Sequence, residues 1–245
     1  MNGHDDPAGD ITRLVERRTR ELEAARADLK LFKSSFFHEV QSPLRAVDGC
    51  IAAALEDFGD QIGPDARSCL DRALTTVHTM SGKVEALLDF FRYSNLPMAR
   101  SGLDLTATAQ GVFDEMTSTQ PHRAGLTVAP GLRVDADAVL LRVVLQNLIG
   151  NALKFSHQRD CARIEIGGAE VGGARRTFVR DNGAGFDARY ANKLFQPFGR
   201  LHSPREFTGT GMSLAIVRRI VERHGGQVGA ESEAGAGATF WFTLP

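Results

Sequence analysis

Hydrophobic residues recur at every seventh position through the first part of the chain, after a polar and acidic start. Two interleaved series describe this pattern: Val15, Leu22, Leu29 and Phe36, and Ile11, Arg18, Ala25 and Phe32. Such spacing is typical of a coiled-coil seam, here with one polar interruption at Arg18. The surrounding Glu, Arg and Ala residues favour a long helix. We therefore predict that residues 1–33 contain a disordered start followed by a coiled-coil helix.

The helical pattern continues into two helices joined by a short turn. Gly59 can end the first helix, and Pro64 can open the second, which runs to about residue 94. Pro43 lies within the first helix and is expected to bend it, because proline removes a backbone hydrogen bond. Two long antiparallel helices cannot bury their apolar faces alone. We therefore predict that residues 34–97 form an all-α hairpin, which pairs in a homodimer as a four-helix bundle.

After a linker at residues 95–97, the pattern changes to short strands and helices with many glycines. Period-3.6 patterns predict helices at residues 105–118, 136–155 and 211–224. Short apolar runs predict strands at residues 126–128, 132–134, 162–167, 176–180, 228–231 and 238–243, with a loop at 199–208. This order of elements predicts an α+β two-layer sandwich over residues 98–245.

Composition and charge narrow the class of protein. The chain has 245 residues, 42% of them hydrophobic, which suffices for a packed core. The formal net charge of −1 and the scattered basic residues give no reason to expect nucleic acid or an anionic membrane as a partner. No apolar run approaches the roughly 20 residues that span a bilayer. The three cysteines, Cys50, Cys69 and Cys161, lack metal-binding spacing and predict reduced, mostly packed thiols in a cytoplasmic protein.

Two segments of the second half carry the chemistry of a nucleotide site. Residues 145–155 predict an amphipathic helix with polar residues Asn147, Asn151 and Lys154. Residues 181–185, Asp-Asn-Gly-Ala-Gly, form an acidic and glycine-rich loop. An amide oxygen can bind a metal ion, a lysine can bind phosphate, and an aspartate can accept a hydrogen bond from an adenine amino group. A second cluster, residues 209–211, opens another helix, whose N-terminus suits phosphate.

In this order the segments resemble the motifs of sensor histidine kinases. Residues 145–155 resemble the N box of that family, residues 181–185 and 209–211 its two glycine boxes, residues 195–198 its F box, and residues 37–44 its H box. The resemblance runs from about Glu16 to Pro245. Within the family, the motif sequences are most similar to those of kinases carried behind PAS or phytochrome sensors. It implies a Bergerat (GHKL) ATP-binding fold for residues 98–245.

The resemblance implies ATP and Mg²⁺ as cofactors and a role for each site residue. Asn151 would supply oxygen to Mg²⁺ bridging the ATP phosphates. Asn147 and Lys154 lie within one helical turn of Asn151 and could assist it and the phosphates, or be ordinary surface residues. Asp181 would bind the adenine amine. The glycine boxes would leave room for the base and border the triphosphate through Gly183, Gly185, Gly209, Thr210 and Gly211. Phe195 and Phe198 could shape the lid or only pack in the core.

The H box implies that His38 accepts a phosphoryl group. With Phe36 at heptad position a, His38 takes position c and points toward solvent. Glu39 can accept the Nδ1 proton and leave Nε2 as the nucleophile toward the γ-phosphoryl of ATP. Catalysis would then rest mainly on positioning and charge neutralisation. Ser42 occupies the family position that helps position water for dephosphorylating the partner, or is a surface serine before proline.

The sequence departs from the family pattern at two positions, and the one at Ser213 leaves a second function open. Ser213 stands where a third glycine is usual, and Gln41 where arginine is frequent. The leading interpretation is a kinase that phosphorylates His38 and then a response regulator receiver domain. An upstream sensor domain or sensor protein would act through the helix at residues 11–36. The alternative is a catalytically weakened kinase that acts as a response-regulator phosphatase or scaffold. A chaperone or topoisomerase module of the same superfamily would not carry an H box in a two-helix segment.

Overall fold

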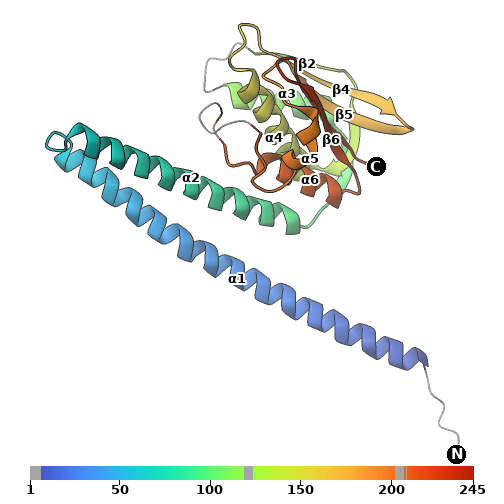
Figure 1. Ribbon diagram of the computed structural model, residues 1–245. Coiled ribbons are helices and arrows are strands. Elements are labelled where there is room, and N and C mark those ends of the chain that lie inside the picture. The colour runs from blue at the N-terminus through green and yellow to red at the C-terminus, as the bar shows by residue number, and fades with distance from the viewer. Residues whose placement is uncertain (1–6, 119–123, 202–206, 208) are drawn as a thin grey trace, which may run out of the picture. The chain divides into compact units, whose positions relative to one another are not determined.

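The computed structural model describes residues 7–118, 124–201, 207 and 209–245, and in the first helix the side chains of residues 15–21, 23 and 35 onwards (Figure 1). The chain divides into two compact units, Met1–Val84 and Glu85–Pro245. The side chains of most of the predicted coiled-coil seam, and part of the predicted loop at residues 199–208, lie outside the described residues.

The first unit is a helical hairpin made by α1 (Pro7–Phe58) and the first part of α2 (Pro64–Asn95). Pro43 lies inside α1, and the helix continues past it to Phe58. The turn requires glycine at position 59, because an added Cβ there would lie 2.3 Å from the carbonyl oxygen of Leu55. The amides of Gln61 and Ile62 close the turn by donating to the Phe58 carbonyl, at 2.8 and 3.0 Å.

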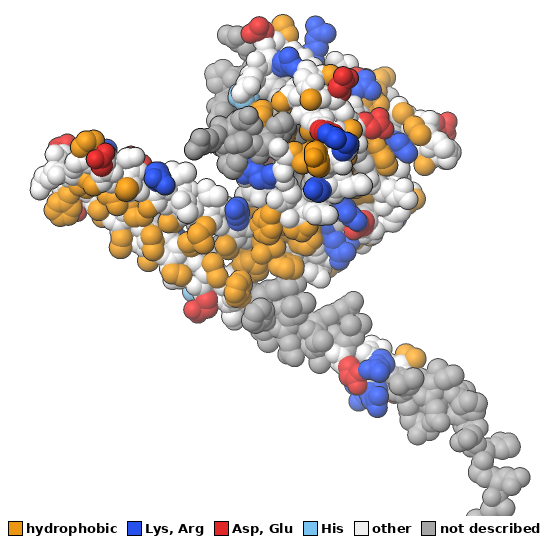
Figure 2. Space-filling view, in the orientation of Figure 1, with side chains coloured by type: hydrophobic (Ala, Val, Ile, Leu, Met, Phe, Trp, Pro, Cys, Tyr) orange, Lys and Arg blue, Asp and Glu red, His pale blue; other side chains and the backbone are white. Residues whose placement is uncertain are grey.

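The two helices of this unit leave much of their apolar surface exposed. Phe37 and Val77 are the buried hydrophobic side chains among its described residues. Phe36, Val47 and Phe58 are about half exposed, at 49%, 47% and 54%. They are spaced by eleven residues, about three helical turns, so they fall on one stripe of α1. Figure 2 shows hydrophobic side chains gathered along the hairpin.

The second unit alternates short strands with helices. Its elements are β1 (Arg100–Asp104), α3 (Leu105–Thr117), β2 (Gly125–Val128), β3 (Arg133–Asp137), α4 (Ala138–Ser156), β4 (Arg163–Val171), β5 (Ala174–Asp181), η1 (Ala188–Tyr190), α5 (Ala191–Leu194), α6 (Ser213–Arg223), β6 (Val228–Glu233) and β7 (Gly237–Thr243). The five-stranded sheet has the order β2-β4-β5-β7-β6, in which only the β2–β4 pair is parallel. The polar β1, which the hydrophobic pattern did not predict, pairs with β3 in a separate sheet.

One face of the five-stranded sheet packs against helices to form the core of this unit, as predicted for a two-layer sandwich (Figure 1). Ile164 and Ile166 of β4, and Phe240 and Phe242 of β7, are buried at alternate positions, as one-sided burial of a strand requires. Among the described helices, α4 alone is long and apolar enough to cross a membrane. Its residues Leu140, Leu145, Leu148 and Ile149 are completely or almost completely buried, so it is a core helix.

The start of α4 is fixed by Asp137, which caps the helix. Its carboxylate accepts hydrogen bonds from the amides of Val139 and Leu140 at 3.0 Å and of Ala99 at 2.8 Å. Burial acts to raise the pKa of Asp137, but these three bonds outweigh it and hold the pKa below its usual value. The Asp137 amide donates to Nε2 of the buried His224 at 3.1 Å. The beginning of α4 is thereby joined to the end of α6.

The last turns of α2 belong to the second unit, which begins at Glu85 rather than after residue 97. Arg223 of α6 donates to the carbonyls of Tyr93 and Leu96, at 2.5 Å each. Partly buried side chains of the same turns pack against the core of the second unit, namely Leu87, Phe90 and Tyr93. A change of sequence pattern marks where a helix ends, whereas the extent of a unit depends on these contacts.

The three cysteines correct one expectation. Cys50, Cys69 and Cys161 are free thiols, as predicted, but all three are exposed rather than packed. Cys50 and Cys69 lie on the helices of the hairpin, where few side chains are buried.

Candidate nucleotide-binding site

A pocket opens in the second unit between the end of α4, the loop after β5 and the beginning of α6. Counting its space open to solvent, the pocket encloses about 740 Å³. It brings together seven of the predicted site residues, which are Asn151, Lys154, Asp181, Gly185, Gly209, Thr210 and Gly211. Segments far apart in the sequence therefore meet as the motifs predicted.

Asp181 is the buried acid of the pocket, at the end of β5. Its side chain accepts a hydrogen bond from the Gly183 amide at 2.8 Å. Burial raises its pKa to about 6, although hydrogen bonds from the amides of Gly183 and Ala238 act in the opposite direction. None of the described residues forms an ion pair with it. A carboxylate in this position can accept a hydrogen bond from a ligand donor such as an exocyclic amine.

The loop after Asp181 is packed so closely that it needs its glycines. A Cβ on Gly183 would lie 2.4 Å from the carbonyl oxygen of Phe155, and one on Gly185 would lie 2.1 Å from that of Glu233. Gly185 also has a φ of 63°, which favours glycine. Gly183 is not among the residues that line the pocket, so its part is to let the loop pass Phe155.

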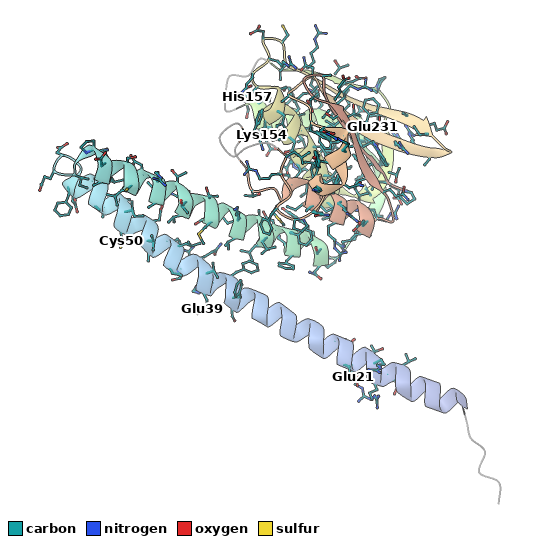
Figure 3. All side chains as sticks on the ribbon, in the orientation of Figure 1. Glu21, Glu39, Cys50, Lys154, His157 and Glu231 are labelled. Atoms are coloured by element: carbon teal, nitrogen blue, oxygen red, sulfur yellow. The ribbon has the colours of Figure 1, made fainter. Side chains whose placement is uncertain are left out.

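Lys154 and Arg200 give the pocket a positive side. Burial, and then the charge of Arg200, lower the pKa of the half-buried Lys154. The Lys154 ammonium lies 4.4 Å from the ring centroid of Phe155, which lines the same pocket, and Figure 3 labels Lys154 on α4. Arg200 donates to the carbonyls of Phe207 and Gly209, at 2.6 Å each. Two cations facing one cavity favour an anionic ligand such as a phosphate chain.

The second glycine cluster lies where the pocket meets α6. Gly209 and Gly211 have φ values of 138° and 77°, and a Cβ on Gly211 would lie 2.8 Å from the backbone carbon of Phe198. Phe198 itself has a φ of 62°, a left-handed conformation that is strained for a bulky residue. Ser213, the first residue of α6, lines the pocket, as does Thr210. The pocket therefore contains the side chain that replaces the expected third glycine.

Some predicted residues lie elsewhere in the structure. Asn147 is not among the pocket-lining residues, and its amide donates to the Val143 carbonyl one turn back along α4, at 2.8 Å. Phe195 is buried in the core, with its ring centroid 6.5 Å from that of Phe240. His38, Glu39 and Ser42 lie on α1 of the first unit, where their side chains are exposed as predicted for a reachable histidine.

Several pocket residues were not found from the sequence. Arg200 belongs to a segment predicted only as a loop, and a single arginine there has no periodic neighbours to mark it. Apolar pocket residues carry no motif signal either, because core packing explains them equally well, and they include Phe186, Leu194, Leu201, Phe207 and Leu214.

Comparison with known proteins identifies the domain that carries this pocket. Residues 136–245 match the family described as histidine kinase-, DNA gyrase B- and HSP90-like ATPase. Relatives that align with more than nine tenths of this chain are named methanogenesis regulatory histidine kinase FilI and sensor histidine kinase AruS. The chain is a sensor histidine kinase transmitter core. Its second unit is a GHKL ATPase-type domain preceded by helices, and ATP is the nucleotide that such a domain binds.

The relatives are much longer than the transmitter core. Phytochrome-like protein Cph1 of Synechocystis is 34% identical over 231 residues, which are 92% of this chain and 30% of Cph1. The methanogenesis regulatory histidine kinase FilI of Methanothrix harundinacea is 31% identical over 94% of this chain and 26% of FilI. The crystal structure of full-length ShkA in complex with AMPPNP matches 87% of this chain and 45% of that chain, with a TM-score of 0.60 and 26% identity. The chain thus spans less than a third of the length of Cph1 and of FilI.

Proposed function

We propose that this transmitter core phosphorylates His38 with ATP and passes the phosphoryl group to an aspartate on a response regulator receiver domain. The observation that carries the proposal is the pocket, which combines the buried acid Asp181 with the cations Lys154 and Arg200. An acceptor for an amine and donors for phosphates are the two kinds of group that ATP needs. The family match and the names of the relatives support the same reaction.

Within the pocket, each residue has a role that its surroundings allow. Asp181 accepts a hydrogen bond from the adenine amine, and Lys154 and Arg200 bind phosphate oxygens. Asn151 fits Mg²⁺, because its side chain lines the pocket and forms no hydrogen bond with the described residues. Those residues contain no cluster of three or more acidic, histidine or cysteine ligands, so the metal would rely on phosphate oxygens and water as well. Bound there, Mg²⁺ would neutralise phosphate charge.

His38 is the proposed phosphoryl acceptor, since its side chain on α1 is exposed and therefore accessible to a reactant. Nε2 attacks the γ-phosphorus, the bond from that phosphorus to the β,γ-bridging oxygen breaks, and ADP leaves. The neutral imidazole keeps its proton on Nδ1 before the attack, which leaves the Nε2 lone pair available. The adjacent Glu39 accepts the Nδ1 proton as the bond from Nε2 to phosphorus forms, so the ring of the phosphohistidine is neutral. Ser42, one helical turn further along, would position water for removing the phosphoryl group from the partner.

A homodimer is the proposed assembly. Phe36, Val47 and Phe58 form an exposed apolar stripe on α1, and Met80 of α2 is 48% exposed. A second hairpin packed on these side chains would complete a four-helix bundle. An upstream sensor domain or sensor protein would act through α1, which is continuous from Pro7 into the hairpin.

The deciding experiment incubates the purified protein with γ-labelled ATP and Mg²⁺, beside a His38→Ala variant. We expect acid-labile and alkali-stable label in the natural protein and none in the variant, while both bind ATP equally. Equal label in both proteins would exclude His38 as the acceptor.

A second candidate is a weakened kinase that acts as a response-regulator phosphatase or scaffold. It is favoured by Ser213, whose side chain lines the pocket where the family pattern has glycine. ATP binding without any phosphohistidine would support it, and Ser213→Gly should then restore labelling.

A further inference from the structure

Arg159 lies outside the pocket, in the turn that follows α4, and its guanidinium holds three backbone carbonyls. Nε donates to the oxygen of Asn182 at 2.9 Å, and Nη2 donates to those of Gly183 at 3.1 Å and Gly235 at 2.5 Å. The arginine itself is held by its amide, which donates to the Ser156 carbonyl at 2.9 Å. An exposed side chain with this many ordered bonds is fixed in place rather than solvated.

These carbonyls belong to the two loops that flank Asp181. Asn182 and Gly183 follow it directly, and Gly235 lies in the turn between β6 and β7. The Gly235 amide donates to the Ala184 carbonyl at 2.7 Å, so the two loops are also joined to each other. Arg159 therefore bridges a double loop whose position sets that of the aspartate.

One peptide group connects Arg159 with the carboxylate. The carbonyl of Asn182 and the amide of Gly183 form a single planar unit. Its oxygen accepts from Arg159, and its N–H donates to Oδ1 of Asp181 at 2.8 Å. The positive guanidinium polarises this peptide, and polarised hydrogen bonds in a chain strengthen one another. The N–H is thereby oriented toward one carboxylate oxygen.

We propose that Arg159 is a positioning residue for base recognition, which acts on Asp181 through the Asn182–Gly183 peptide. The inference rests on the proposed contact between Asp181 and the adenine amine. With Oδ1 of Asp181 held by the Gly183 amide, the carboxylate has a fixed orientation in which it can receive the 6-amino group. Lysine cannot replace arginine here, because a single ammonium does not reproduce the planar fork that bonds three carbonyls.

The test compares two nucleotides, ATP and purine riboside triphosphate, which lacks the 6-amino group. Dissociation constants with Mg²⁺ are measured by calorimetry for the natural protein and for the Asp181→Ala, Arg159→Ala and Arg159→Lys variants. A matched control is Arg175→Ala, because Arg175 is an exposed arginine of β5 whose side chain makes no hydrogen bond with the described residues.

We expect the natural protein to prefer ATP by about tenfold, the value of one well-placed hydrogen bond to a charged group, and Asp181→Ala to abolish the preference. Arg159→Ala should reduce the preference to about threefold or less through weaker ATP binding, with the binding of purine riboside triphosphate changed less than about twofold. The preference of Arg159→Lys for ATP should lie between that of the natural protein and that of Arg159→Ala. The preference of Arg175→Ala should equal that of the natural protein.

Two results would overturn the inference in distinguishable ways. If Arg159→Ala weakens both nucleotides equally, the arginine supports the fold of the pocket without positioning Asp181. If the natural protein shows no preference for ATP, the proposed contact between Asp181 and the adenine amine fails, and the inference fails with it. Should Arg159→Ala not fold, Arg159→Lys decides, because a preference for ATP equal to that of the natural protein would contradict the proposal.

Discussion

The two units of the chain use hydrophobic residues in opposite ways. The second unit buries its apolar side chains in one continuous cluster, in which Leu105, Leu145 and Ile149 are completely buried. The described side chains of the hairpin bury little beyond Phe37 and Val77, and they leave Phe36 and Phe58 about half exposed. Apolar burial is the main favourable contribution to folding. The second unit therefore contains its own source of stability, whereas the described part of the hairpin leaves an apolar surface exposed, on which the proposed dimer would form.

The strongest way to test this contrast is to remove core volume from α4. We expect Leu148→Ala to lower the free energy of unfolding by about 3 kcal/mol, because the removed methyl groups leave a cavity in a packed interior. Leu148 is 1% exposed. Urea unfolding can be followed by fluorescence of Trp241, the single tryptophan of the chain, which lies in the second unit.

A matched control lies on the same helix. Val139 of α4 is 58% exposed, so Val139→Ala should change the unfolding free energy by less than about 0.5 kcal/mol. Equal losses for the two variants would mean that the core of the second unit does not carry its stability.

The next largest effect is expected on assembly. Val47→Glu places a carboxylate in the middle of the exposed stripe on α1, and burying an ionised group without a partner is costly. We expect the dissociation constant of the homodimer to rise by about a hundredfold or more. Sedimentation velocity over a dilution series measures this, and ATP binding by the second unit should be unchanged.

Arg45→Glu on the same helix is the control for a negative charge, because Arg45 is exposed and outside the apolar stripe. It should leave the dimer largely intact. If it dissociates the dimer as strongly as Val47→Glu does, overall charge repulsion rather than the apolar stripe explains the effect.

The sequence predicted the periodic elements well and the non-periodic ones poorly. The helices α4 and α6 and the strands β4, β5 and β7 follow from apolar periodicity, which reflects one-sided burial directly. The strand β1 was missed because its residues are polar or exposed at four of five positions. The short elements η1 and α5 were missed because single turns show no repeat.

The residues of the candidate site also differ in how well the sequence predicts them. Motif residues such as Asn151 and Asp181 were predicted because their side chains carry chemistry at a characteristic spacing, and the pocket brings them together. Arg159 donates to backbone carbonyls of the loop after β5, and Arg200 donates to carbonyls seven and nine residues further along the chain. No local pattern shows which carbonyls an arginine will reach. Asn147 matches the spacing but bonds to its own helix, since four residues of α4 displace it by about 6 Å along the axis.

The smallest effect concerns pH and again separates the two units. The pKa of Asp181 is raised to about 6 by burial, so its carboxyl is ionised and accepts hydrogen bonds above that pH, and becomes neutral below it. One pH unit below the pKa leaves about a tenth of the groups ionised, so most of the tenfold preference for ATP should be lost, which lowers the affinity for ATP by about fivefold between pH 7 and pH 5. Isothermal titration with ATP and with purine riboside triphosphate measures this, because the phosphates titrate in both ligands and only ATP offers the 6-amino group.

The ratio of the two affinities should therefore change with pH around the pKa of Asp181. In Asp181→Asn the ratio should no longer depend on pH. Val47→Glu should leave that ratio unchanged, since none of the hairpin residues that the structure describes lines the pocket. A ratio that stays constant from pH 7 to pH 5 in the natural protein would show that the buried carboxylate does not contact the base.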